Sequence, residues 1–172
     1  LLSPERMVYN LLMTTGLSYR WLGVAGVEIT CGAHTLLVDP FFTRPPLPRL
    51  FFGRVEPDRA LIARHLRPAD AILVTHAHYD HVMDVPAAAE LTGAQVYGSP
   101  NVRALAQLFG LPAAQTQVIA PGDVLRIGPF RVTVCAAKHM DTPLDRWING
   151  PLQAGLHRPL RLTDFRMDAC FS

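Results

Sequence analysis

The sequence predicts a single α/β domain. Between residues 71 and 109, short apolar runs alternate with stretches of helical spacing in the order strand, helix, strand, helix, which is the pattern of an α/β layer. At 172 residues, the chain is long enough for one hydrophobic core and too short for two ordinary domains. Its 49% hydrophobic and 17% charged residues are typical of a globular protein. We therefore expect residues 1–172 to form one domain.

The remaining elements follow from apolar patterning and turn residues. Alternating apolar residues, bounded by glycine and proline, predict further strands around the layer, and helical spacing predicts one more helix. A loosely helical apolar pattern also opens the chain, where it is compatible with a short packing helix or with contact to a membrane surface. The predicted strands cover residues 18–22, 27–30, 35–38, 71–75, 95–97, 117–120, 124–127 and 130–136, and the helices residues 57–66, 85–91 and 101–109.

Residues 41–52 combine aromatic side chains with three prolines. Pro45, Pro46 and Pro48 fall within four positions, and proline removes the backbone donors that helices and central strands need. We therefore expect a stiff loop without a helix. This loop either lines an apolar substrate pocket or is anchored by its own hydrophobic ends.

The most informative stretch is His76-Ala77-His78-Tyr79-Asp80-His81, directly after the apolar run 71–74. In an extended backbone, side chains two apart point the same way, so His76, His78 and Asp80 leave the strand end on one side. His81 is an odd number of positions from these residues, so in an extended backbone its side chain points the other way. It reaches the same centre only if a helix begins there. Two imidazoles with an open position are typical of a hydrolytic zinc site, and the Asp-His pair indicates a second metal.

This motif resembles the signature of the metallo-β-lactamase superfamily, and the resemblance extends from about residue 19 to the end. Trp21-Leu22-Gly23 and residues 36–41, Leu-Leu-Val-Asp-Pro-Phe, are similar to the branch of ascorbate-6-phosphate lactonase-like proteins and N-acylphosphatidylethanolamine-hydrolysing phospholipase D. The resemblance implies an αββα sandwich, of which this chain supplies the N-terminal half plus an irregular C-terminal segment. A bridging carboxylate and a final histidine belong to the other half, and neither Asp164 nor Asp168 has the right context to replace them.

The resemblance also assigns roles to individual residues. It implies that His139, at the end of the last predicted strand, is the third nitrogen ligand beside His76 and His78, while Asp80 and His81 hold part of a second ion. Asp39 either supports the ligands through a hydrogen bond or only caps the turn before Pro40. The expected cofactor is zinc, one or two ions, with manganese or iron as alternatives.

We therefore expect a zinc-dependent hydrolase in which a metal-bound hydroxide attacks an ester, lactone or phosphodiester, with His76, His78 and Asp80 in the catalytic centre. One alternative is a truncated, non-catalytic family member that binds a metal or a partner. Another is a superfamily nuclease, which the net charge of +2 and the scattered arginines disfavour.

The sequence also predicts partners and location. No run of eighteen apolar residues appears, so we expect no transmembrane segment. Three widely spaced cysteines favour a reducing, cytoplasmic compartment, with peripheral membrane association as an alternative. The expected substrate is a small-molecule or lipid-like ester. A second copy of the chain is an expected partner, because the sheet face meant for the other half would otherwise expose apolar surface.

Overall fold

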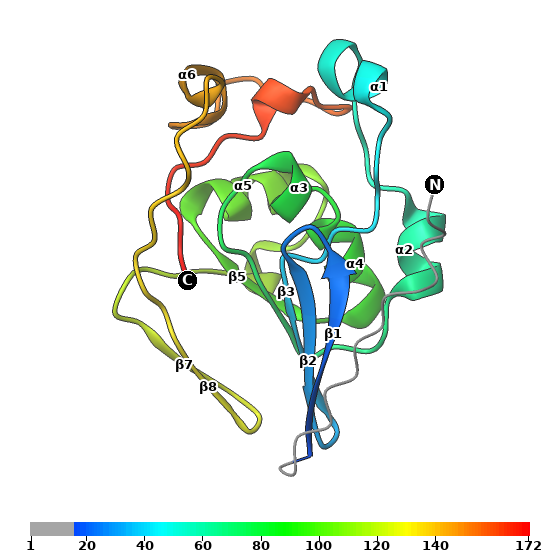
Figure 1. The fold of residues 1–172 in the computed structure, drawn as a ribbon, viewed down its shortest axis with the longest axis vertical. Coiled ribbons are helices and arrows are strands. Elements are labelled where there is room, and N and C mark those ends of the chain that lie inside the picture. The colour runs from blue at the N-terminus through cyan, green and yellow to red at the C-terminus, as the bar shows by residue number, and fades with distance from the viewer. Residues whose placement is uncertain (1–15) are drawn as a thin grey trace.

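The computed structural model describes residues 16–172. The helix expected near the N-terminus lies outside the described residues. The described chain forms a six-stranded mixed sheet, a separate two-stranded sheet and a set of short helices (Figure 1).

The six-stranded sheet has the strand order β1-β2-β3-β4-β5-β6. The first three strands pair antiparallel, and β3 through β6 pair parallel. Parallel neighbours need a crossover, and the intervening helices supply it. The strands are β1 (Leu17–Gly23), β2 (Gly26–Cys31), β3 (His34–Val38), β4 (Ala71–Leu73), β5 (Gln95–Gly98) and β6 (Thr116–Val118).

Helices cover one face of this sheet, where they form the larger hydrophobic core with Leu37, Ile72 and Val96. The helices that precede residue 110 are α1 (Leu47–Phe52), α2 (Arg59–His65), α3 (Tyr79–Val82), α4 (Val85–Thr92) and α5 (Pro100–Leu108). The predicted alternation of strands and helices between residues 71 and 109 is confirmed, as is the helix within residues 57–66. The α/β fold class is confirmed with it.

Capping residues explain where these helices begin and end. The side chains of Asp58 and Ser99 accept hydrogen bonds from backbone amides in the first turns of α2 and α5, as N-cap residues do. Gly93 ends α4 in the left-handed conformation, with φ of 73°, which glycine adopts without a steric penalty.

The expectation of a helix-free loop at residues 41–52 is wrong. Helix α1 spans Leu47–Phe52 and carries Pro48 in its first turn. Proline is tolerated there because the first amides of a helix have no intrahelical acceptor. Pro45 and Pro46 precede the helix and only fix the extended entry, so the prolines set the start of α1 and do not prevent it.

The opposite face of the sheet is partly covered by the hairpin of β7 (Val124–Ile127) and β8 (Phe130–Thr133). Leu125 and Ile127 of this hairpin pack on Leu36 and Ala71 of the large sheet. Strand β8 ends three residues before the predicted limit at residue 136. Beyond the hairpin, Tyr19 and Trp21 of β1 stay 41% and 42% exposed.

The C-terminal segment (residues 140–172) has little regular structure apart from α6 (Asp145–Ile148) and the 3₁₀ helix η2 (Leu162–Asp164). It passes over the top of the molecule, where α6 and α1 lie (Figure 1), and returns to the sheet. At its end, the amide of Phe171 donates to Thr75, and Ser172 exchanges two hydrogen bonds with Cys135. The last residues thus lie between the chain that follows β4 and the chain that follows β8. Within residues 16–172, no helix has both the length and the hydrophobicity to cross a bilayer.

Candidate metal centre

The histidine motif lies in a short loop between β4 and α3. His76 and His78 are 4% and 6% exposed. The loop turns into helix at His78, which is the N-cap of α3. A helix thus begins before His81, as it must if the His81 side chain is to reach the same centre as His76 and His78.

His139 follows β8 and approaches this loop from the other side. One ring nitrogen each from His76, His78 and His139 lies within 4.8 Å of the others. The ring centroids are 4.6 to 4.9 Å apart. Imidazoles from two distant parts of the sequence thus converge on one point, as expected, and we call these three residues the histidine cluster.

Hydrogen bonds fix which nitrogen of His76 faces the cluster. The hydroxyl of Thr75 donates to Oδ2 of Asp39 at 2.6 Å, so it accepts from Nδ1–H of His76 at 2.9 Å. A neutral imidazole carries one N–H, which leaves the lone pair on Nε2. This nitrogen is buried and has no hydrogen-bond partner. An unpartnered buried lone pair beside two other imidazoles fits a metal ion that completes its bonding.

The same reasoning applies to His139, whose Nδ1 lies 2.7 Å from the carbonyl oxygen of Met140. The carbonyl only accepts, so Nδ1 carries the proton and Nε2 is the donor to a metal. His78 differs, because its Nε2 lies 3.1 Å from the side-chain oxygen of Asn149 in the C-terminal segment.

Asp80 and His81 lie beside the histidine cluster but outside the group of converging nitrogens within residues 16–172. The His81 ring is 3.8 Å from the His76 ring. Nε2 of His81 lies 3.9 Å from Oδ2 of Asp80, and the Asp80 side chain is 28% exposed. This pair offers one nitrogen and one carboxylate oxygen to a second position.

Asp39 joins the two parts of the site. Its carboxylate accepts from the backbone amide of Thr75 at 2.8 Å, from the Thr75 hydroxyl and from Nδ1 of His81 at 2.8 Å. The residue is 1% exposed and has a φ of 43°, a left-handed conformation that aspartate tolerates better than most residues. Of the two roles considered for Asp39, the geometry favours support of the histidines.

Burial and neighbouring groups shift the pKa values of the histidines at this site. The pKa of His76 is lowered from 6.5 to about 2, first by burial and then by the neighbouring imidazoles, of which His81 contributes most. The pKa of His78 is also lowered, mainly by burial, although its bond to Asn149 opposes the shift. Burial lowers the pKa of His81 as well, but the hydrogen bond and charge of Asp39 outweigh it, so that pKa is raised. At neutral pH, His76 and His78 are therefore neutral and able to bind a metal.

Asn149 is the site residue that the sequence did not single out. It comes ten positions after His139 and is followed by Gly150, a pair typical of a turn. Its role is visible only in its contact with His78, 71 positions earlier in the sequence.

The side chains of Asp164 and Asp168 bind away from the metal centre. Asp164 accepts from the amide of Arg161, and Asp168 accepts from Ser99 and Asn101 at the start of α5. This agrees with the expectation that neither replaces a metal-bridging carboxylate.

Two solved structures share the fold of this chain. Igni18, a metallo hydrolase from the archaeon Ignicoccus hospitalis, superposes with a TM-score of 0.53 at 18% identity, covering 72% of this chain and 49% of that one. A protein of Parabacteroides distasonis, assigned to the metal-dependent hydrolases, gives a TM-score of 0.54 at 15% identity, covering 96% and 61%. At this identity the likeness defines the fold.

The chain belongs to the beta-lactamase superfamily domain family, whose model matches residues 34–157. A UPF0173 metal-dependent hydrolase of Cupriavidus necator is 39% identical over 124 residues, or 69% of this chain and 40% of the relative. Its counterpart in Myxococcus xanthus is 34% identical over 120 residues, or 69% and 38%. The chain thus aligns with about 40% of the length of these curated relatives. The residues matched by the family model include the histidine cluster, Asp39, Asp80 and His81.

Proposed function

We propose that this chain is the metal-binding part of a metal-dependent hydrolase that cleaves an ester, lactone or phosphodiester. The observation that carries the proposal is the histidine cluster, in which the buried Nε2 of His76 has no partner. The cofactor we propose is zinc, with manganese or iron as alternatives, because neutral imidazoles bind all three. When bound, such an ion lowers the pKa of a coordinated water to about 7 and polarises the scissile bond.

The chain's own residues provide the rest of the chemistry. The partly exposed carboxylate of Asp80 can accept a proton from an attacking water. Together with Nε2 of His81, it is also the donor pair for a second ion. Asp39 and Thr75 hold the rings of His76 and His81 in place through the hydrogen bonds described above.

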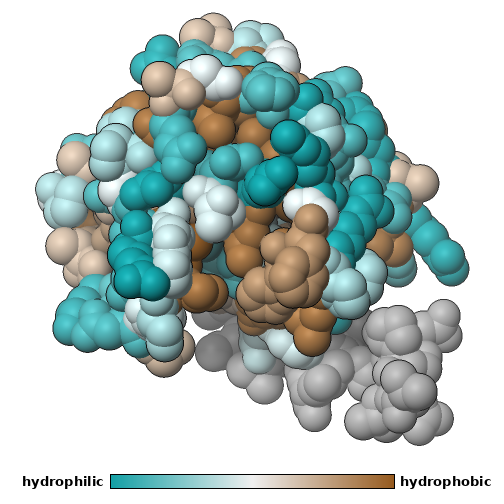
Figure 2. Space-filling view, turned by 90° about the horizontal axis from the view of Figure 1, so that it is seen from above, coloured by the Kyte–Doolittle hydropathy of each residue, from teal (hydrophilic) through white to brown (hydrophobic). Residues whose placement is uncertain are grey.

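A groove between α1 and the C-terminal segment supports the proposal of an apolar substrate. It has a volume of about 280 Å³ and lies between α1, α6 and η2, lined by Phe51, Leu144, Trp147, Ile148, Arg161, Leu162 and Thr163. Ile148 directly precedes Asn149, which contacts His78. Figure 2 looks onto this end of the molecule and shows hydrophobic side chains exposed among polar ones. An ester with its reacting group at the cluster would place an acyl chain in this groove, as the expected lipid-like substrate requires.

The test combines metal analysis with assays of hydrolysis. We expect zinc bound in stoichiometric amounts and turnover of p-nitrophenyl phosphodiesters or of lactones. His76→Ala should abolish both, whereas His157→Ala, which removes an exposed histidine outside the cluster, should change neither. A folded wild-type chain that binds no zinc, manganese or iron would contradict the proposal.

A non-catalytic metal-binding protein is the second candidate. In its favour, the histidine cluster is the one group of converging metal donors within residues 16–172, and Asp164 and Asp168 bind elsewhere. Stoichiometric metal without turnover on any of these substrates would favour this candidate over the hydrolase.

A further inference from the structure

Asn149 is held firmly in the C-terminal segment. Its amide donates to the carbonyl of Asp145 at 2.9 Å, and its own carbonyl accepts from the guanidinium of Arg166. On either side, the amide of Met167 donates to Ile148 at 2.8 Å and the amide of Gly150 donates to Met167 at 2.7 Å. Hydrogen bonds on both sides of Asn149 thus hold its backbone in place, and this determines where its side chain can reach.

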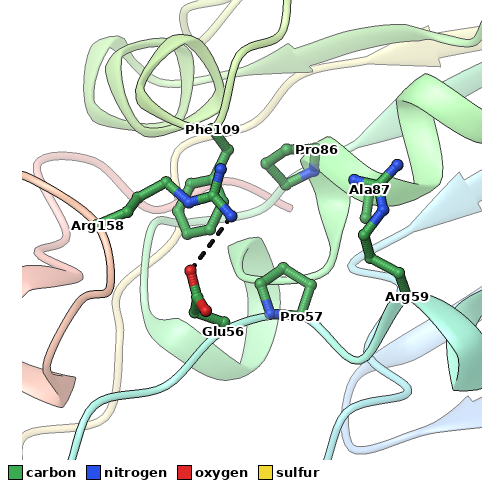
Figure 3. Close-up of a pocket in the computed structure, with 7 residues that line it drawn as sticks. All are labelled: Glu56, Pro57, Arg59, Pro86, Ala87, Phe109 and Arg158. Carbon is green, nitrogen blue, oxygen red and sulfur yellow. Dashed lines mark hydrogen bonds and ion pairs between the residues drawn. The ribbon is translucent and has the colours of Figure 1, made fainter.

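The residues that follow are anchored to the body of the protein. Arg158 stacks on the ring of Phe109 at 4.5 Å and pairs with Glu56 at 3.2 Å, on one side of a small cavity (Figure 3). Val55 donates to the carbonyl of Leu160 at 2.8 Å. Because the segment is attached at several points along its length, the position of Asn149 near the cluster is part of the fold.

Asn149 contacts His78, the one member of the histidine cluster whose Nδ1 has no oxygen acceptor to hold a proton on it. In His76 and His139, Nδ1–H donates to an oxygen, which leaves Nε2 as the metal donor. In His78, it is Nε2 that lies against an oxygen, Oδ1 of Asn149, at 3.1 Å. The amide oxygen only accepts, so the proton of His78 is on Nε2 and the lone pair is on Nδ1.

We propose that Asn149 is a positioning residue that selects the Nε2–H tautomer of His78 and thereby makes Nδ1 its metal donor. The proposal rests on the proposed function, because it assigns a role within the same site. It gives the C-terminal segment a part in metal binding although none of its residues is a ligand. Partners of this kind fix ring orientation and tautomer, and their loss typically weakens metal binding by about 10- to 100-fold.

The test compares Asn149→Ala, Asn149→Asp and Gln153→Ala in the full chain. Zinc affinity, measured by competition with a chromophoric chelator, should fall at least about tenfold in Asn149→Ala. It should stay within about threefold of the wild type, or improve, in Asn149→Asp, because the carboxylate keeps the acceptor and adds a charge that favours the cation. Gln153→Ala removes an exposed amide of the same segment and should have no effect.

A second measurement does not need the metal. In the metal-free wild type, long-range ¹H–¹⁵N NMR correlations should show His78 with its proton on Nε2, and in Asn149→Ala a mixture of tautomers. Protonation on Nδ1 in the wild type, unchanged zinc affinity in Asn149→Ala, or equal weakening in both Asn149 variants would overturn the proposal. A wild type that binds no metal but shows the Nε2–H tautomer would contradict the proposed function, while the selection of this tautomer by Asn149 would still hold.

Discussion

Oδ2 of Asp39 lies 2.8 Å from Nδ1 of His81, although 42 positions separate the two residues in the sequence. The contact spans two neighbouring parallel strands, because Asp39 follows β3 and the histidine motif follows β4. Since the carboxylate also accepts twice from Thr75, which in turn bonds His76, one buried side chain orients two histidines.

We therefore expect Asp39→Ala to destabilise the protein. It would leave the amide and hydroxyl of Thr75 and Nδ1 of His81 without their acceptor, and each unsatisfied buried group costs about 1–3 kcal/mol. The free energy of unfolding in urea should fall by at least about 2 kcal/mol. Asp141→Asn, which alters a carboxylate with 79% side-chain exposure, is the control and should change it by less than about 0.5 kcal/mol. Equal stability of both variants would show that Asp39 does not hold the site together.

The stability of the metal-free protein should depend on pH through His76 and His78. Both pKa values are lowered in the folded state, that of His76 to about 2. The unfolded chain therefore binds more protons below pH 6.5, and the stability present above this pH is lost as the pH falls. Each histidine kept neutral contributes a slope of at most about 1.4 kcal/mol per pH unit. The raised pKa of His81 acts in the opposite sense, with stability that is present below pH 6.5 and lost as the pH rises through its folded value.

Urea unfolding at several values between pH 5.0 and 6.5 measures this dependence. His76 should contribute a positive slope over this range, because its pKa in the folded state, about 2, lies far below it. His76→Gln should reduce the slope and His157→Gln should leave it unchanged. A wild-type slope equal to that of His76→Gln would show that His76 is protonated in the folded protein.

The groove between α1 and α6 should determine acyl-chain preference in an active preparation. Trp147 is 42% exposed and lines the groove, so Trp147→Ala removes apolar surface that a long chain would cover. We expect KM for a p-nitrophenyl octanoate to rise by about fivefold or more, since covering part of an aromatic side chain is worth about 1–2 kcal/mol. KM for the acetate should not change. Trp147→Phe, which keeps an aromatic ring, is the matched control. If Trp147→Ala raised KM equally for both esters, the groove would be excluded as the acyl site.

Tyr19 and Trp21 lie on the same face of β1, at the edge of the sheet face that the β7–β8 hairpin leaves open. Because exposed aromatic residues on a sheet face favour association, we expect a concentration-dependent dimer in light scattering. Trp21→Lys should shift the distribution toward the monomer, and Val24→Lys, which alters an exposed turn residue, should not. A wild type that is monomeric at all concentrations would contradict a second copy as the partner.

The sequence predicted the parts of this structure that depend on local patterns. The strands at residues 35–38 and 71–75 and the helix before Gly93 follow from apolar periodicity and capping residues. The convergence of His139 on His76 and His78 came from a family resemblance, because apolar periodicity does not measure distances between remote strand ends. Helix α1 does not follow from proline content, because proline breaks a helix except in its first turn, where Pro48 lies. Asn149 was not predictable, since its role depends on the path of an irregular segment.

The final residues link the two loops that carry the histidines. Phe171 bonds to Thr75, next to His76, while Ser172 and Cys170 bond to Cys135 and Ala137 on the way to His139. Neither loop can therefore move away without breaking backbone bonds to the same short stretch. In hydrogen-exchange measurements, the amides of Phe171, Ser172 and Ala137 should consequently open together as one cooperative unit, and zinc should slow all three by the same factor.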